Sequence, residues 1–85
     1  MPEVSRFLGI VILMYFDEHN PPHFHVRYQR YEAAIDIRTL GVMQGTLPPR
    51  IHGLVIKWAG LHQNKLLANW DRCRNEEQPN KIPPL

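Results

Sequence analysis

The first half of the chain has a hydrophobic pattern that predicts three β-strands. Residues 9–16 form an uninterrupted apolar run, too short for a typical helix and rich in the β-branched and aromatic residues that favour strands. Polar and apolar residues then alternate over residues 23–28 and again over residues 31–37. Since alternate side chains of a strand point to one side, one face should enter the core, formed by Phe24, Val26, Tyr28, Tyr31, Ala33, Ile35 and Ile37.

Gln29 and Arg30 separate the two alternating strands and predict a two-residue hairpin turn, although such turns favour Asn or Gly. A slip of one residue would exchange the two faces. The predicted register places three pairs on the face away from the core: His23 with Asp36, His25 with Ala34, and Arg27 with Glu32. Ala34 is small and should leave room for a ligand beside His25.

The second half of the chain predicts a short edge strand and then helical structure. Residues 42–47 form the strand, which Gly45 interrupts. Pro48 and Pro49 end it and can begin a helix, because the first helical turn does not need their missing N–H groups. Apolar residues then recur at three- and four-residue intervals on one stripe that should face the sheet: Ile51, Leu54, Val55, Trp58, Leu61, His62, Leu66, Trp70 and Cys73.

Gly60 and the polar residues 62–65 leave open whether the stripe belongs to one long helix or to two short ones, with Asn64 as the N-cap of the second. Residues 76–85 contain three prolines and predict an extended or loose tail. The expected fold is therefore α+β. A small antiparallel sheet of three or four strands in meander order packs against one or two C-terminal helices.

Composition limits the classes of protein to which the chain can belong. Its 85 residues fit a single domain, residues 1–85. A domain of this size buries only ~60–65% of the surface that its unfolded chain exposes, so a partner protein or a second copy of the chain could add stability. Residues 9–16, apolar on both faces, are the expected contact. The net charge of +2 allows RNA binding without favouring it.

Three features of the sequence predict a cytoplasmic protein with no membrane contact. Cys73 is the single cysteine, so no disulfide can form within the chain. The apolar run of residues 9–16 is much shorter than the ~20 residues that cross a bilayer. The start of the chain also lacks the basic region of a signal peptide.

The candidate chemistry lies in residues 17–25, between the first two predicted strands. Two acidic residues and three of the five histidines fall there, in the order Asp17, Glu18, His19, His23 and His25. Imidazole ionises near neutral pH, so it can donate a proton, accept one or bind a metal ion. Pro21 and Pro22 fix two φ angles and stiffen the loop that carries these side chains.

Four uses of this hairpin stay open. His23 and His25 can act as general acid and base on an anionic substrate, with Asp36 orienting His23. They can bind a metal ion with His19 or Asp17 as a third ligand, although the H-x-H spacing alone does not define a ligand set. They can contact a partner protein, or they can be ordinary polar residues of an exposed strand. No cofactor follows from the sequence.

The segment Asp17-Glu18-His19-Asn20-Pro21-Pro22-His23-Phe24-His25, with Arg6-Phe7 and Met14-Tyr15 before it and Leu66-Leu67-Ala68-Asn69-Trp70 after it, resembles a bacterial family of domains of unknown function, number 4160. The resemblance implies a gene beside that of a small partner protein and, for some members, the role of toxin in a toxin–antitoxin pair. Any family function would fall on the matching positions, which are Arg6, Tyr15, His19, His23 and His25. One departure is the Gln29-Arg30 turn, where similar sequences often carry glycine.

The leading expectation combines the resemblance with the histidine hairpin. We expect a toxin-like protein that acts on RNA or another anionic target and is neutralised by an antitoxin-like partner, with its status as an enzyme left open. His23 and His25 would supply acid–base chemistry, Asp36 would orient His23, and Arg6 or Arg27 would stabilise negative charge. Tyr15 and His19 complete the expected binding residues.

Overall fold

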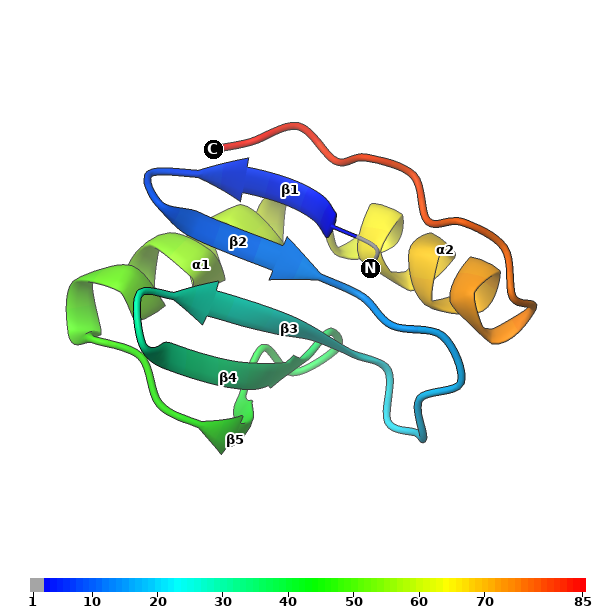
Figure 1. Ribbon diagram of the computed structural model, residues 1–85, viewed down its shortest axis with the longest axis horizontal. Coiled ribbons are helices and arrows are strands. Elements are labelled where there is room, and N and C mark those ends of the chain that lie inside the picture. The colour runs from blue at the N-terminus through cyan, green and yellow to red at the C-terminus, as the bar shows by residue number, and fades with distance from the viewer. Residues whose placement is uncertain (1–2) are drawn as a thin grey trace.

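The chain folds into one antiparallel sheet with two helices behind it, as a computed structural model that describes residues 3–85 shows (Figure 1). The sheet follows chain order, β1-β2-β3-β4-β5. Its strands are β1 (Glu3–Phe7), β2 (Ile10–Leu13), β3 (His23–Tyr28), β4 (Tyr31–Asp36) and β5 (Val42–Gly45), and the helices are α1 (Pro49–Leu61) and α2 (Gln63–Arg74). The α+β class and the meander order are confirmed, but the sheet has five strands where three or four were predicted.

The additional strand is β1, which the hydrophobic pattern does not reveal. Val4, Ser5 and Phe7 are all buried, so the strand lacks a regular alternation. Its pairing with β2 shifts register between Glu3 and Ser5. Such an irregularity places an extra residue on one strand and therefore breaks the period of two.

The hairpin of β3 and β4 has the predicted register, with His23 opposite Asp36 and His25 opposite Ala34. Gln29 adopts a φ of 51°, which lets the tight turn form without glycine. The predicted core face is also confirmed for the four residues that are at most 1% exposed: Phe24, Val26, Ile35 and Ile37.

Strand β2 is shorter than the apolar run that predicted it. It spans Ile10–Leu13, and Ile10 and Ile12 are fully buried in the core. On the opposite side, Leu13 is only 4% exposed within the single chain, whereas Val11 is half-buried. The second face of β2 is therefore already partly covered without a partner.

Strand β5 ends at Gly45, two residues before the predicted end. Gly45 has a φ of 80°, and a Cβ atom there would lie 2.1 Å from the backbone oxygen of Glu32. Only glycine accepts this conformation and this close approach. All four residues of β5 are exposed at the edge of the sheet.

Two helices form, and they meet at His62. His62, not Asn64, occupies the N-cap position of α2, so the predicted cap is wrong and Asn64 lies inside the first turn. Leu61 is 67% exposed although the stripe predicted it to be buried, because α1 ends at this residue. The other large stripe residues pack on the sheet, and Trp58 contacts both Phe7 and Phe24.

The tail after α2 runs back beside β1 (Figure 1). The Ile82 N–H donates to the Val4 carbonyl at 2.8 Å, and the Ile82 side chain is buried. Trp58 Nε1 donates to the Pro83 carbonyl at 2.8 Å. Asn69 of α2 both donates to and accepts from the backbone of Asn80. The tail is thus extended and held along this stretch.

Among residues 3–85, neither helix has the length and apolar character needed to cross a membrane.

Candidate functional site

Strand β3 carries two histidines on the outer face of the sheet, the face opposite the helices. His23 and His25 are two residues apart and so point to the same side, with their ring centroids 5.1 Å apart. We predicted both to be exposed, but His23 is buried. It is the first residue of β3, and its ring packs against Trp70 of α2 at a centroid distance of 5.2 Å.

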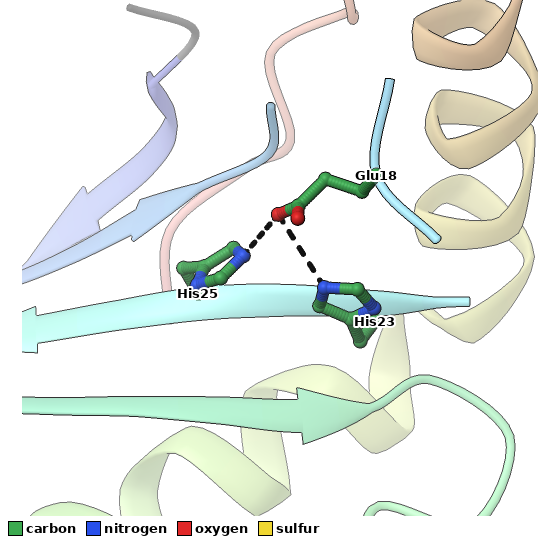
Figure 2. A group of neighbouring side chains, drawn as sticks. All are labelled: Glu18, His23 and His25. Atoms are coloured by element: carbon green, nitrogen blue, oxygen red, sulfur yellow. Dashed lines mark hydrogen bonds and ion pairs between the residues drawn. The ribbon is translucent and has the colours of Figure 1, made fainter. Parts of the chain in front are cut away.

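A third side chain reaches both rings from the loop between β2 and β3. Oε1 of Glu18 contacts Nε2 of His25 and lies 3.4 Å from Nε2 of His23 (Figure 2). The end of this loop next to β3 is held in place. The N–H of Ile37, directly after β4, donates to the Pro22 carbonyl at 2.9 Å, and Pro22 is buried. Glu18 is therefore presented to the histidines by a loop that is tied to the sheet.

The tautomer of His23 follows from its second hydrogen bond. Nδ1 lies 2.8 Å from the backbone oxygen of Pro21. A carbonyl oxygen only accepts, so Nδ1 must donate, and a neutral ring then has its lone pair on Nε2. This lone pair faces the Glu18 carboxylate. Two electron-rich atoms 3.4 Å apart repel each other unless a proton or a metal cation lies between them.

Glu18, His23 and His25 form a donor set of the kind that binds transition metals. Their ligand atoms all lie within 4.8 Å of one another. Two ligands of a tetrahedral Zn²⁺ ion are roughly 3.3 Å apart, since each is about 2.0–2.1 Å from the ion. The 3.4 Å separation of His23 and Glu18 is close to that value. Glu18 and His25 are in direct hydrogen-bond contact and would have to move apart to bind the same ion. The exposed fractions of the side chains are 9% for His23, 26% for Glu18 and 29% for His25, so the cluster is open on the side of Glu18 and His25.

Asp36 does not make the contact expected of it. It lies opposite His23 in the sheet, but its Oδ1 accepts from the N–H groups of Arg38 at 2.7 Å and Thr39 at 3.0 Å. The carboxylate therefore closes the turn after β4. The groups that orient the His23 ring are the Pro21 carbonyl and Glu18.

The loop residues proposed as a third metal ligand lie outside the cluster. His19 and Asp17 are exposed, and Glu18 between them takes that position. Tyr15 packs its ring against His25, with centroids 4.7 Å apart. The structure thus joins Tyr15 to the predicted histidines and leaves His19 in the solvent.

The two predicted arginines both lie on the outer face and each pairs with a glutamate. Arg6 Nη2 lies 2.8 Å from Oε1 of Glu3, and the hydrogen bond from Arg6 is the main cause that lowers the pKa of Glu3. Arg27 Nε donates to Oε1 of Glu32 at 3.2 Å. Strand pairing places Arg6 and Arg27 on either side of Val11.

A pocket of about 310 Å³ lies on the outer face next to the cluster. Its lining includes Leu13, Tyr15, His25, Arg27, Ala34 and Gln44. The prediction that Ala34 leaves space beside His25 agrees with this pocket, because the two residues face each other across β3 and β4. His25 belongs to both the cluster and the pocket wall.

The sequence placed Glu18 in the candidate segment without a specific role, and it gave Trp70 no role in the site. Glu18 stands next to the histidine motif, but a loop has no periodicity from which its direction could be deduced. Trp70 was assigned to the core stripe, and it is indeed buried. Its contact with His23 depends on how α2 packs at the end of the sheet.

Comparison with known proteins gives a family without an assigned activity. The family model described as "Domain of unknown function (DUF4160)" matches residues 9–71. No curated protein and no solved structure matches the chain.

Proposed function

The chain belongs to the DUF4160 family, and we propose from the site itself that it binds a divalent transition metal ion, with Zn²⁺ as the best match. The ligands are an oxygen of Glu18 and the Nε2 atoms of His23 and His25. The observation that carries this proposal is the convergence of three donor atoms within 4.8 Å, one of them a lone pair fixed by the Pro21 carbonyl.

The surroundings of the ligands favour a metal over ordinary surface polarity. Metal-bound histidines usually donate their other ring N–H to a carbonyl or carboxylate, which fixes the tautomer and the ring direction. His23 has this partner in Pro21, and its ring is also packed against Trp70. His25 lies between the rings of Tyr15 and His23. Histidines of an ordinary exposed strand would not need these constraints.

Three protein ligands leave a zinc ion with an open coordination position, the arrangement of catalytic rather than structural zinc sites. The open side of the cluster includes His25, which also lines the outer-face pocket. A metal ion bound there would polarise an anionic group or activate a water molecule next to the pocket. The proposed function is therefore metal-assisted chemistry on a molecule bound in this pocket.

Metal titration of the purified, chelator-treated protein tests the proposal. Isothermal titration calorimetry with Zn²⁺, supported by native mass spectrometry, should show one ion per chain. Glu18→Gln, His23→Gln and His25→Gln should each weaken binding by at least about tenfold, the usual effect of losing one strong metal contact or its support. His19→Gln is the matched control, because His19 lies in the same loop and is exposed.

The proposal fails if the wild-type protein binds no ion, or if the three cluster variants bind as tightly as His19→Gln does. Circular dichroism of each variant shows whether a loss of binding reflects unfolding.

A second proposal uses the same imidazoles without a metal. The hydrogen bond between His25 and Glu18 forms an imidazole–carboxylate pair at the pocket wall, which is an arrangement suited to general acid–base catalysis. In this form the chain is the toxin of a toxin–antitoxin pair and acts on RNA or another anionic target. Glu18, rather than Asp36, would then hold the catalytic ring.

Growth assays separate the two proposals. If the acid–base form is right, expression of the chain alone slows growth, co-expression of the neighbouring gene restores it, and His25→Ala abolishes the effect. The activity of the purified protein on RNA or another anionic target would also survive treatment with a chelator. Loss of activity on chelation, with recovery on adding Zn²⁺, would instead support the metal proposal.

A further inference from the structure

Strand pairing places a cation beside the metal cluster, on the same face of the sheet. His25 and Arg27 are two residues apart on β3, so their Cα atoms are separated by roughly 6.5 Å and their side chains point the same way. Both residues line the outer-face pocket. A group in this pocket can therefore contact the cluster and Arg27 at the same time.

Arg27 retains most of its hydrogen-bonding capacity. Its Nε donates to Glu32 at 3.2 Å, and among residues 3–85 no hydrogen bond uses its two Nη atoms. The Glu32 side chain is 69% exposed, and exposed ion pairs of this kind contribute little to the stability of the folded chain. The terminal fork of the guanidinium is thus free to bind an oxyanion through two hydrogen bonds.

The pocket has the size and lining of a site for a small polar group. Its 310 Å³ is at the lower end of the volumes of ligand pockets. Leu13 and Ala34 supply apolar surface, and Tyr15 and Gln44 add side chains that can donate hydrogen bonds. Glu32 also lines the pocket, but its carboxylate is paired with Arg27 Nε. The remaining Arg27 donors, the neutral donors and an open metal position together favour an anion.

On the basis of the proposed metal centre, we propose that this pocket binds the phosphate group of a phosphate ester. One phosphate oxygen would bind the metal ion, and two others would accept from the Nη atoms of Arg27. A carboxylate has only two oxygens, so it cannot bind the metal through one oxygen and still receive both hydrogen bonds on separate oxygens. The tetrahedral phosphate group meets both requirements.

The cobalt-substituted protein allows metal and phosphate to be measured separately. Binding of Co²⁺ is followed through its visible absorption, and phenyl phosphate, inorganic phosphate and benzoate are then titrated in turn. Both phosphate compounds should change the cobalt spectrum, and phenyl phosphate should bind at least about tenfold more tightly than benzoate.

Variants of the pocket identify the phosphate contact. Arg27→Gln should weaken the binding of phenyl phosphate by at least about tenfold, the loss expected for hydrogen bonds to charged groups. Arg27→Lys should restore only part of it, because lysine keeps the charge and lacks the fork. Ala34→Leu should exclude phenyl phosphate by filling the pocket. All three should bind Co²⁺ as the wild type does, and Arg30→Gln in the exposed turn is the matched control.

The results separate this inference from the proposed function. A protein that binds no Co²⁺ overturns both. A protein that binds Co²⁺, but whose affinity for phenyl phosphate is unchanged by Arg27→Gln and Ala34→Leu, retains the metal centre and overturns the phosphate site. Tighter binding of benzoate than of phenyl phosphate would assign the pocket to carboxylates and would also overturn it.

Discussion

The carboxylate of Glu18 lies 3.4 Å from Nε2 of His23, on the side of the ring where a neutral imidazole has its lone pair. The Pro21 carbonyl fixes the tautomer of His23, because it accepts a hydrogen bond from Nδ1, the other nitrogen of the ring. A positive charge between the two groups would turn their repulsion into attraction. This relationship links a loop stiffened by two prolines to metal binding, and the expected response of the protein to zinc follows from it.

Zinc should raise the stability of the wild-type protein, because an ion that binds only the folded chain shifts the unfolding equilibrium. At a free zinc concentration one hundred times the Kd, the gain is about 2.7 kcal/mol. Thermal unfolding with and without Zn²⁺ measures it. Glu18→Gln should lose the zinc-dependent rise in Tm, whereas His19→Gln should keep it. An equal rise in both variants would show that zinc binds elsewhere.

The fluorescence of Trp70 should report metal binding, since its indole lies 5.2 Å from the His23 ring. Trp58 contacts Phe7, Phe24 and His62 instead. We therefore expect Trp58→Phe to retain the change in emission on adding Zn²⁺, and Trp70→Phe to lose it while still binding the ion. If Trp58→Phe removes the signal, the metal does not bind beside Trp70.

Two glycines should respond in opposite ways to replacement by alanine. Gly45→Ala forces a Cβ atom against the Glu32 carbonyl at a φ of 80°, and should destabilise the protein by more than about 1 kcal/mol. Gly53 is exposed inside α1 with no atom near its Cβ position, so Gly53→Ala should stabilise by about 0.5–1 kcal/mol. Urea unfolding of the two variants provides the comparison. A Gly45→Ala protein as stable as the wild type would contradict the close approach of β5 to β4.

Stability should fall on acidification partly because of His62. Burial, with a smaller contribution from the charge of Lys65, lowers the pKa of His62. The folded state therefore favours the neutral ring. This contribution is fully present above the unfolded pKa of about 6.5, and it is lost as the pH falls through the lower folded pKa. Urea unfolding at pH 7.5 and 5.5 measures how much free energy of unfolding is lost on acidification. This loss should be smaller for His62→Gln than for the wild type. A larger loss of unfolding free energy in the variant would contradict this role of His62.

The sequence by itself determined the β3–β4 hairpin, including the pairs His23 with Asp36 and His25 with Ala34. It could do so because these contacts are local, and because the two-residue period and the turn position define the register. The same reasoning located both histidines on one face and the space beside Ala34. It also predicted Asp36 as the partner of His23, and there it was wrong: side chains opposite each other in a sheet do not have to bond, and the backbone N–H groups after β4 were closer competitors.

Only the tertiary structure decided which groups surround His23. Glu18 comes from a loop without periodicity, and Trp70 of α2 lies 47 residues after His23 in the chain. Strand β1 and the tail are likewise joined by the hydrogen bond from Ile82 to Val4, two residues near opposite ends of the chain. Hydrophobic patterns indicate which side of an element is buried. They do not indicate which element covers that side, because this depends on the packing of distant segments.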